Sequence, residues 1–154
     1  MKSLFNVPNI IDYIRILFLL IAYAMHKSSF MAFSAFYIIS FALDLIDGPV
    51  ARYMRQVTWY GTVLEQLIDR MSNLMLVALC IQQPNAPFKW FLILWSSIDL
   101  VSHWCQFMAT AHFNIHHKSQ QSKFKLLDAY YKYKAFMAPL IIGTEVFFIT
   151  YLNM

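Results

Sequence analysis

The chain has 154 residues, of which 60% are hydrophobic, 18% aromatic and 13% charged, with a formal net charge of +4. Soluble domains average about 45–50% apolar and 25% charged residues, so a soluble core of this size would not bury so many large apolar side chains. The composition therefore predicts an integral membrane protein, and its few Gly and Pro residues and two cysteines exclude disordered, collagen-like and disulfide-rich classes.

Five apolar segments predict membrane-spanning helices, in chain order Asn9–Met25, Ser28–Leu43, Trp59–Ile81, Phe88–Ala111 and Ala135–Leu152. Helices are expected because a lipid-facing isolated strand cannot satisfy its backbone, and the segments lack the alternating pattern of barrel strands. Asp12 and Arg15 lie too deep in the first segment for a cleaved signal peptide. We therefore expect one all-α, multi-pass transmembrane domain over residues 1–154.

Basic residues lie between the apolar segments rather than in one stripe with stacking aromatics, so nucleic acid is not an expected partner. With a cytoplasmic N-terminus, Lys and Arg residues concentrate on the cytoplasmic side, which carries Lys2, Arg52, Arg55, Lys118, Lys123, Lys125, Lys132 and Lys134. The opposite side carries only Lys27 and Lys89. The polar connection over residues 112–134 is then cytoplasmic, and we expect it to be partly an amphipathic helix at the membrane surface.

Four carboxylates lie in one short stretch, at the end of the second segment and the start of the third. Asp44 and Asp47 are three residues apart and Glu65 and Asp69 are four apart, so each pair projects from one face of a helix. Converging carboxylates repel one another unless a cation lies among them, and their hard oxygens suit Mg²⁺, Mn²⁺ or Ca²⁺. The stretch predicts a divalent metal site. The alternative is a set of salt bridges to nearby arginines, namely Arg52, Arg55 and Arg70.

Small residues and an arginine accompany these carboxylates. Gly48 and Ala51 lie on the first helix and Gly61 on the second, so a backbone or a ligand can approach closely. Arg52 follows and can form paired hydrogen bonds with a phosphate group. Carboxylates, a divalent metal and an arginine together are suited to diphosphate chemistry.

Written in order, the stretch reads Asp44-Leu-Ile-Asp47-Gly48-Pro-Val-Ala51-Arg52, then eight residues, then Gly61-Thr-Val-Leu-Glu65-Gln-Leu-Ile-Asp69. It resembles the signature of the CDP-alcohol phosphotransferases, D-x-x-D-G-x-x-A-R, eight residues, G-x-x-x-D-x-x-x-D, and matches seven of its eight fixed positions. The resemblance implies a helical membrane fold, usually with six spans and homodimeric. It also implies transfer of a substituted phosphate from a CDP-linked alcohol to a second alcohol, with release of CMP.

Other patches resemble the eukaryotic phosphatidylinositol synthases within this family. Val7-Pro8-Asn9-Ile10, with Arg15 soon after, resembles the start of their first span, and Gly143-Thr144-Glu145 resembles their fifth. Ser97-Ile98-Asp99-Leu100-Val101-Ser102-His103-Trp104 is similar to their D-x-x-S-H-W element. The resemblance implies CDP-diacylglycerol and myo-inositol as substrates, and an endoplasmic reticulum membrane with the active site facing the cytoplasm.

Residue roles follow from the same resemblance. The positions expected to bind two Mg²⁺ or Mn²⁺ ions are Asp44, Asp47, Glu65 and Asp69. Asp69 is also the expected general base, which takes a proton from an inositol hydroxyl as that oxygen attacks the lipid-linked phosphorus. The positions expected to contact CDP-diacylglycerol are Gly48, Ala51, Arg52, Thr58 and Gly61. Asp99 and His103, four residues apart, either contact the acceptor or form a structural hydrogen bond.

Two features depart from the family pattern. Glu65 replaces the third Asp, and one extra methylene moves the carboxylate by roughly 1.5 Å, where catalytic geometry must hold within about 0.5 Å. The chain also stops at Leu152-Asn153-Met154, at the end of a fifth segment. We expect either a shortened enzyme with its C-terminus on the far side or a copy that needs a partner.

Two alternatives stay open at this point. The first is another acceptor, such as glycerol 3-phosphate or a choline-like alcohol, because the signature fixes only the CDP donor. A phosphorylated acceptor would call for more buried basic residues than Arg15 and Arg70, which favours neutral inositol. The second is a catalytically silent homologue that binds CDP-lipid or pairs with an active subunit, an interpretation motivated by Glu65 and the absent sixth span.

Overall fold

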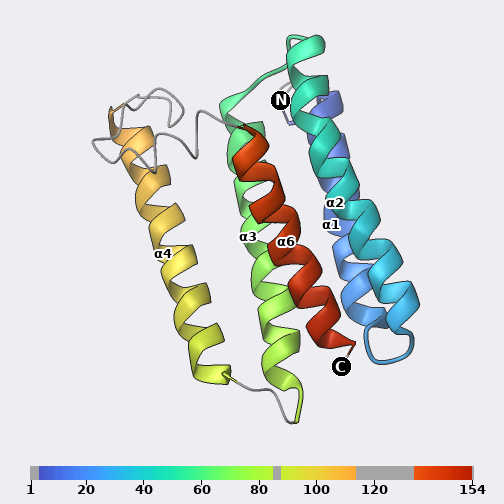
Figure 1. Ribbon diagram of the computed structural model, residues 1–154. Helices are drawn as coiled ribbons and strands as arrows, with labels where there is room; N and C mark the ends of the chain where they lie inside the picture. The colour runs from blue at the N-terminus through green and yellow to red at the C-terminus, as the bar shows by residue number, and fades with distance from the viewer. Residues whose placement is uncertain (1–3, 85–87, 114–133, 154) are drawn as a thin grey trace. The chain divides into compact units, whose positions relative to one another are not determined.

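The structure is a computed structural model that describes residues 4–84, 88–113 and 134–153. Every regular element in these residues is a helix, in the order α1 (Val7–Met25), α2 (Phe30–Tyr53), α3 (Trp59–Gln82), α4 (Lys89–Phe113) and α6 (Lys134–Leu152), as Figure 1 shows. The all-α prediction is confirmed, and the five helices fall on the five predicted segments. The amphipathic helix expected within residues 112–134 lies outside the described residues, apart from the end of α4.

The span predicted over Ser28–Leu43 and the helical stretch predicted from Asp44 to Ala51 form one helix, since α2 continues to Tyr53. Gly48 and Pro49, which often end a helix, lie inside it. Proline removes one backbone hydrogen bond but its fixed φ is helical, so the helix continues through it. As a consequence, the whole Asp44–Arg52 part of the signature is helical.

Two of the described helices, α1 and α2, are long and apolar enough to cross a membrane. Ile142–Leu152 is a further apolar stretch within α6, and α3 carries Glu65, Asp69 and Arg70. Large apolar side chains on α1 and α2, such as Leu17 and Leu20, are more than half exposed, which suits a lipid environment. For α3, α4 and α6, membrane spanning stays a prediction.

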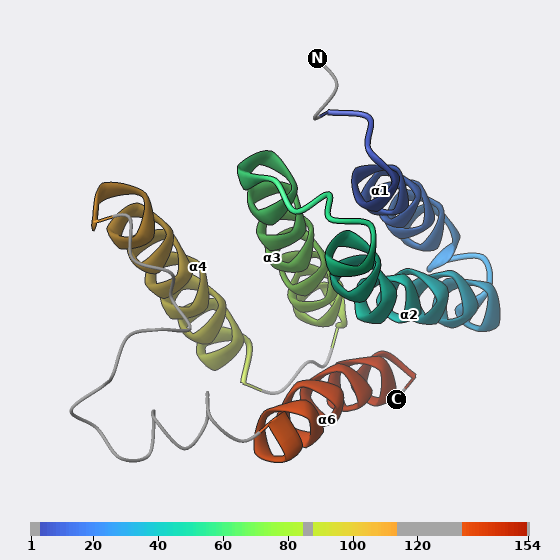
Figure 2. The same cartoon turned by 90° about the horizontal axis from the view of Figure 1, so that it is seen from above.

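The chain forms two compact units that divide between Met75 and Leu76, inside α3. In the first unit, α1 and α2 form an antiparallel hairpin and lie side by side in both views (Figure 1, Figure 2). Ser29 closes the turn between them, since its hydroxyl caps α2 by accepting from the Ala32 amide at 3.2 Å. Leu19, Ala22, Phe33, Tyr37 and Ile68 form the apolar part of this unit's core.

The second unit contains the end of α3, with α4 and α6. The Trp95 and Phe148 rings contact each other with centroids 5.4 Å apart, and the Cys80 thiol donates to the Phe148 carbonyl at 4.0 Å. An apolar cavity of about 370 Å³ is lined by these aromatic rings together with Phe91 and Phe147. The expected single domain stays a prediction, because α3 runs through both units.

Candidate active site

The centre of the first unit is the guanidinium of Arg15, whose side chain is 4% exposed. Its Nη1 lies 3.2 Å from Asp12 Oδ1 and 2.9 Å from Asp47 Oδ2. Its Nη2 lies 2.5 Å from Asp44 Oδ1 and 2.8 Å from Asp69 Oδ1. One buried cation thus pairs with four carboxylates that come from three helices.

Helical periodicity explains why these side chains meet. Asp12 and Arg15 are three residues apart on the buried face of α1, which also carries Leu19, and residues three or four apart lie on one helix face. Asp44 and Asp47 share a face of α2 in the same way. The first half of α3 adds Asp69. The polar faces of α1, α2 and α3 therefore meet at Arg15.

Hydrogen bonds between helices fix this register. The Ser40 hydroxyl donates to the Arg15 carbonyl at 3.2 Å, which joins α2 to α1 beside the guanidinium. The hydroxyls of Tyr37 on α2 and Ser72 on α3 lie 2.8 Å apart, less than one turn from Asp69. Between helices in an apolar environment, such bonds set the relative positions of the side chains around them.

The charges in this cluster do not balance, because a single guanidinium faces four carboxylates. Two buried polar atoms also have no hydrogen-bond partner within the described residues, Arg15 Nε and Asp44 Oδ1. Asp44 Oδ1 touches the guanidinium, but the angle of this ion pair is not that of a hydrogen bond. Buried polar atoms of this kind are costly unless a further partner satisfies them.

A divalent metal fits the donor chemistry of this cluster, since carboxylate oxygens are the ligands that Mg²⁺, Mn²⁺ and Ca²⁺ prefer. No three carboxylate, histidine or cysteine side chains among the described residues are arranged to hold a metal ion, and the cation that contacts the aspartates is Arg15. Glu65, the remaining predicted ligand, lies one turn before Asp69 on α3 with an exposed side chain. The structure thus brings three of the four predicted ligands together around an arginine.

The end of α2 is tied back to the start of α1. Arg55 adopts a φ of 53°, the left-handed conformation that usually holds glycine after a helix. Its amide donates to the Arg52 carbonyl at 3.2 Å and the Gln56 amide to the Ala51 carbonyl at 2.9 Å, which satisfies the last carbonyls of the helix. Gln56 in turn accepts from Asn6 Nδ2 through its carbonyl and from the Val7 amide through Oε1, both at 3.1 Å.

Gly61 on α3 lies against the Asn9 side chain of α1. A Cβ at this position would lie 2.8 Å from Asn9 Oδ1 and 3.2 Å from Thr58 Oγ1, so a larger residue would displace the Asn9 side chain. Asn9 is 1% exposed, and the Tyr13 and Tyr60 hydroxyls meet nearby at 3.0 Å. The close approach that the sequence predicts at Gly61 is therefore made by a side chain of α1.

Thr58 is the N-cap of α3, because its Oγ1 accepts from the Gly61 amide at 3.0 Å. Gly48 differs from Gly61, since the nearest neighbour of a Cβ there is Arg52 Nη1 at 3.4 Å, an ordinary contact. Arg52 thus lies over Gly48 on the exposed side of α2. Contacts with a nucleotide stay predictions for all five positions, Gly48, Ala51, Arg52, Thr58 and Gly61.

Asp99 and His103 lie in the second unit, on α4. The His103 ring Nδ1 is 2.9 Å from the Asp99 carbonyl and 3.4 Å from Asp99 Oδ1. The structural hydrogen bond that the spacing allows is therefore present. A contact with the acceptor stays a prediction.

Sequence reasoning missed Asp12 and the central position of Arg15. Both were noticed only as ionisable residues too deep for a signal peptide, and Arg15 as part of a family pattern. A signal for their role was available, because an Asp and an Arg three residues apart in an apolar span face a bundle interior and mark a site. The salt-bridge partners considered were Arg52, Arg55 and Arg70, whereas the guanidinium that pairs with the aspartates is that of Arg15.

Comparisons with known proteins identify the family to which the chain belongs. The CDP-alcohol phosphatidyltransferase profile matches residues 5–153. The chain is 35% identical over 145 residues to CDP-diacylglycerol--inositol 3-phosphatidyltransferase 1 of Arabidopsis thaliana. The matched region covers 93% of this chain and 63% of that protein. It is 32% identical over 149 residues to the Homo sapiens CDP-diacylglycerol--inositol 3-phosphatidyltransferase, covering 92% of this chain and 67% of the relative.

A Saccharomyces cerevisiae protein of the same name is 30% identical over 150 residues, covering 94% of this chain and 66% of the relative. The chain therefore spans about two thirds of the length of these curated relatives. No solved structure was found to match it. The profile match over nearly the whole sequence shows that the chain belongs to the CDP-alcohol phosphatidyltransferase family.

Proposed function

We propose that this protein transfers the phosphatidyl group of CDP-diacylglycerol to myo-inositol, forming phosphatidylinositol and releasing CMP. The relatives at 30–35% identity carry the name of this reaction. The observation that carries the proposal is the meeting of Asp44, Asp47 and Asp69 at one buried cation. These three are signature positions, and they come from two helices that sequence spacing alone does not bring together.

Members of this family generally depend on a divalent metal, and we propose that Asp44, Asp47, Glu65 and Asp69 hold two Mg²⁺ or Mn²⁺ ions. When bound, such ions neutralise the diphosphate and favour departure of CMP. Asp69 is 33% exposed, so its carboxylate is open to a water-soluble acceptor. As general base it takes the proton of an inositol hydroxyl while that oxygen forms a bond to phosphorus and the bond to the CMP oxygen breaks.

The donor nucleotide is proposed to lie along the exposed side of the signature helix. Arg52 lies over Gly48 there, and its guanidinium is suited to paired hydrogen bonds with a phosphate. Ala51, Thr58 and Gly61 complete the proposed contacts. Thr58 Oγ1 accepts a hydrogen bond within the cap of α3, so toward the nucleotide its hydroxyl would act as a donor.

The test is release of CMP by the purified chain in lipid or detergent, supplied with CDP-diacylglycerol and Mg²⁺ or Mn²⁺. We expect release that depends on myo-inositol and that falls at least about a hundredfold in Asp69→Asn, the lower range for loss of a general base. Parallel reactions with glycerol 3-phosphate and choline distinguish the acceptor. Release with one of these and none with inositol would overturn the choice of acceptor.

A catalytically silent homologue is the second candidate, and the observation that favours it is Glu65 in place of the signature Asp. It predicts binding of metal or CDP-lipid without release of CMP. Glu65→Asp separates the two candidates, because it restores the shorter carboxylate with the same charge. Activity that appears only in Glu65→Asp would identify the natural chain as silent through geometry alone.

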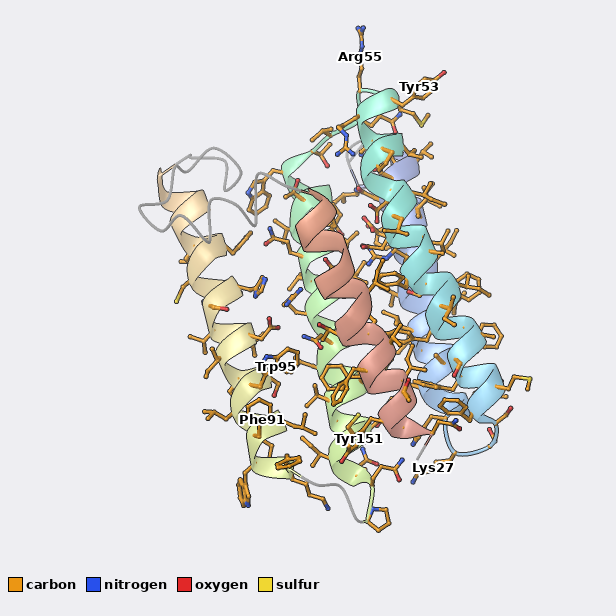
Figure 3. The ribbon with its side chains drawn as sticks, in the orientation of Figure 1. Lys27, Tyr53, Arg55, Phe91, Trp95 and Tyr151 are labelled. Carbon is orange, nitrogen blue, oxygen red and sulfur yellow. The ribbon has the colours of Figure 1, made fainter. Side chains whose placement is uncertain are left out.

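The family is membrane-bound, and we propose the endoplasmic reticulum, a site that faces the cytoplasm, and a homodimer. Charge distribution supports the orientation. Arg55 and Tyr53 project at one end of the α1–α2 hairpin and Lys27 lies at the other end (Figure 3). The signature end carries Arg52 and Arg55, as the cytoplasmic side of a membrane protein does.

A further inference from the structure

Arg15 and a bound metal ion would compete for the same carboxylates. Its guanidinium is in contact with three of the four carboxylates proposed as metal ligands, Asp44, Asp47 and Asp69. A divalent cation and a guanidinium cannot both be the main partner of the same oxygens. A cation of the chain itself therefore joins these carboxylates.

The two sides of the guanidinium differ in burial. Nη1 faces Asp12 and Asp47, whose side chains are each 4% exposed. Nη2 faces Asp44 and Asp69, which are 27% and 33% exposed. An ion that enters from water therefore reaches Asp44 and Asp69 before it reaches the buried carboxylates.

Asp12 gives Arg15 a partner that belongs to its own helix. It lies three residues before Arg15, is 2% exposed and is outside the family signature. If Asp44, Asp47 and Asp69 bind another cation, Nη1 still has Asp12. Within the described residues, Arg15 Nε has no hydrogen-bond partner, and Asp44 Oδ1 contacts the guanidinium without a hydrogen bond, so the present pairing does not satisfy either group fully.

We propose that Arg15 is a positioning residue that competes with the divalent metal: its Nη2 holds Asp44 and Asp69 together until metal ions take these carboxylates, while Asp12 retains the guanidinium beside the site. The inference rests on the proposed function, which supplies the metal. It accounts for a buried arginine among metal ligands, where a fixed cation would otherwise only weaken metal binding. It also gives Asp12 a role that the family signature does not assign.

The test is direct Mn²⁺ binding to the full chain in detergent, measured by the electron paramagnetic resonance signal of free Mn²⁺, with no substrate present. Arg15→Met removes the competing charge at similar length, and we expect Mn²⁺ to bind at least about tenfold tighter, a change of about 1.4 kcal/mol. Arg55→Met makes the same chemical change at an exposed position at the end of α2. We expect this control to leave the affinity within about twofold of the natural chain.

Metal-free Arg15→Met has four carboxylates without a counter-ion, so its thermal midpoint should fall and its stabilisation by Mn²⁺ should grow. If this variant fails to fold, Arg15→Lys serves instead. A single ammonium cannot bridge both pairs of carboxylates as the planar guanidinium does. We expect Arg15→Lys to bind Mn²⁺ about threefold tighter or more, since part of the competition is lost.

Asp12→Asn separates this role from simple electrostatic attraction. Without Asp12, Arg15 depends more on the other carboxylates, so Mn²⁺ should bind more weakly. In the Arg15→Met background the same change should have little effect, and a double-mutant cycle measures the difference. An equal weakening in both backgrounds would show that Asp12 acts on the metal without Arg15 and would overturn its part of the proposal.

Folded Arg15 variants that bind Mn²⁺ no tighter than the natural chain would overturn the inference, while metal-dependent release of CMP by the natural chain would leave the proposed function intact. Absence of Mn²⁺ binding in the natural chain and in all variants would overturn both. Binding by Arg15→Met alone would support the competition in its strongest form.

Discussion

Two hydroxyl contacts in the first unit join different helices, whereas four hydroxyls on α4 and α6 bond to their own helix. Ser40 donates to the Arg15 carbonyl of another helix, and Tyr37 meets Ser72. In the second unit, four hydroxyls donate to a carbonyl three or four residues earlier, those of Ser96, Ser97, Ser102 and Thr150. Both arrangements satisfy a polar group in apolar surroundings, but only the first constrains the position of a neighbouring helix.

The difference explains why the site lies where it does. Four carboxylates from three helices must hold positions within about 3 Å of one guanidinium, so the helices around it cannot slide. A hydroxyl bonded to its own helix places no such limit on its neighbours. Aromatic contacts such as that between Trp95 and Phe148 fill space in the second unit and tolerate more adjustment than charged groups do.

The largest expected effect compares one carboxylate from each unit. Asp47→Asn removes a charge that is 4% exposed and paired with Arg15, so we expect inositol-dependent CMP release to fall at least about a hundredfold. Asp99→Asn changes a residue whose carbonyl still accepts from His103, and we expect a loss of less than about threefold. A comparable loss in Asp99→Asn would contradict this difference between the two carboxylates and favour a contact between α4 and the acceptor.

A smaller effect is expected from matched glycine substitutions. Gly61→Ala places a methyl group 2.8 Å from Asn9 Oδ1, a clash that we expect to cost about 1–3 kcal/mol. A Cβ at Gly143 on α6 meets nothing within 4 Å, so Gly143→Ala should gain up to about 1 kcal/mol of helix propensity. Thermal unfolding in detergent should therefore show a lower midpoint for Gly61→Ala and an equal or higher one for Gly143→Ala.

The smallest effect concerns the hydroxyls themselves. Ser40→Ala leaves the Arg15 carbonyl without its inter-helix donor, and we expect a loss of about 1 kcal/mol in the free energy of unfolding. Ser102→Ala removes a bond within α4 at an exposed position, so the change should stay within about 0.5 kcal/mol. Chemical denaturation of both variants measures the difference, and equal losses would contradict the distinction between the two units.

The sequence predicted the helices well because apolar runs and their polar breaks are local properties. The helical stretch predicted from Asp44 to Ala51 continues α2, although it contains Gly48 and Pro49. Asp44, Asp47 and Asp69 were predicted as site residues from their spacing and their family pattern. The cation that joins them was not, because Arg15 lies on a helix whose rotation against α2 and α3 depends on tertiary contacts such as that of Ser40.

The connection between the two halves of the signature behaves as a spacer of fixed length. Of the residues between Arg52 and Gly61, Met54, Arg55 and Gln56 close the end of α2, and Thr58 with the first turn of α3 opens the next helix. Gln56 is also bonded to the start of α1. An inserted or deleted residue would break one of these ends and misalign Asp69 with Arg15, so the spacing of the signature is itself a structural constraint.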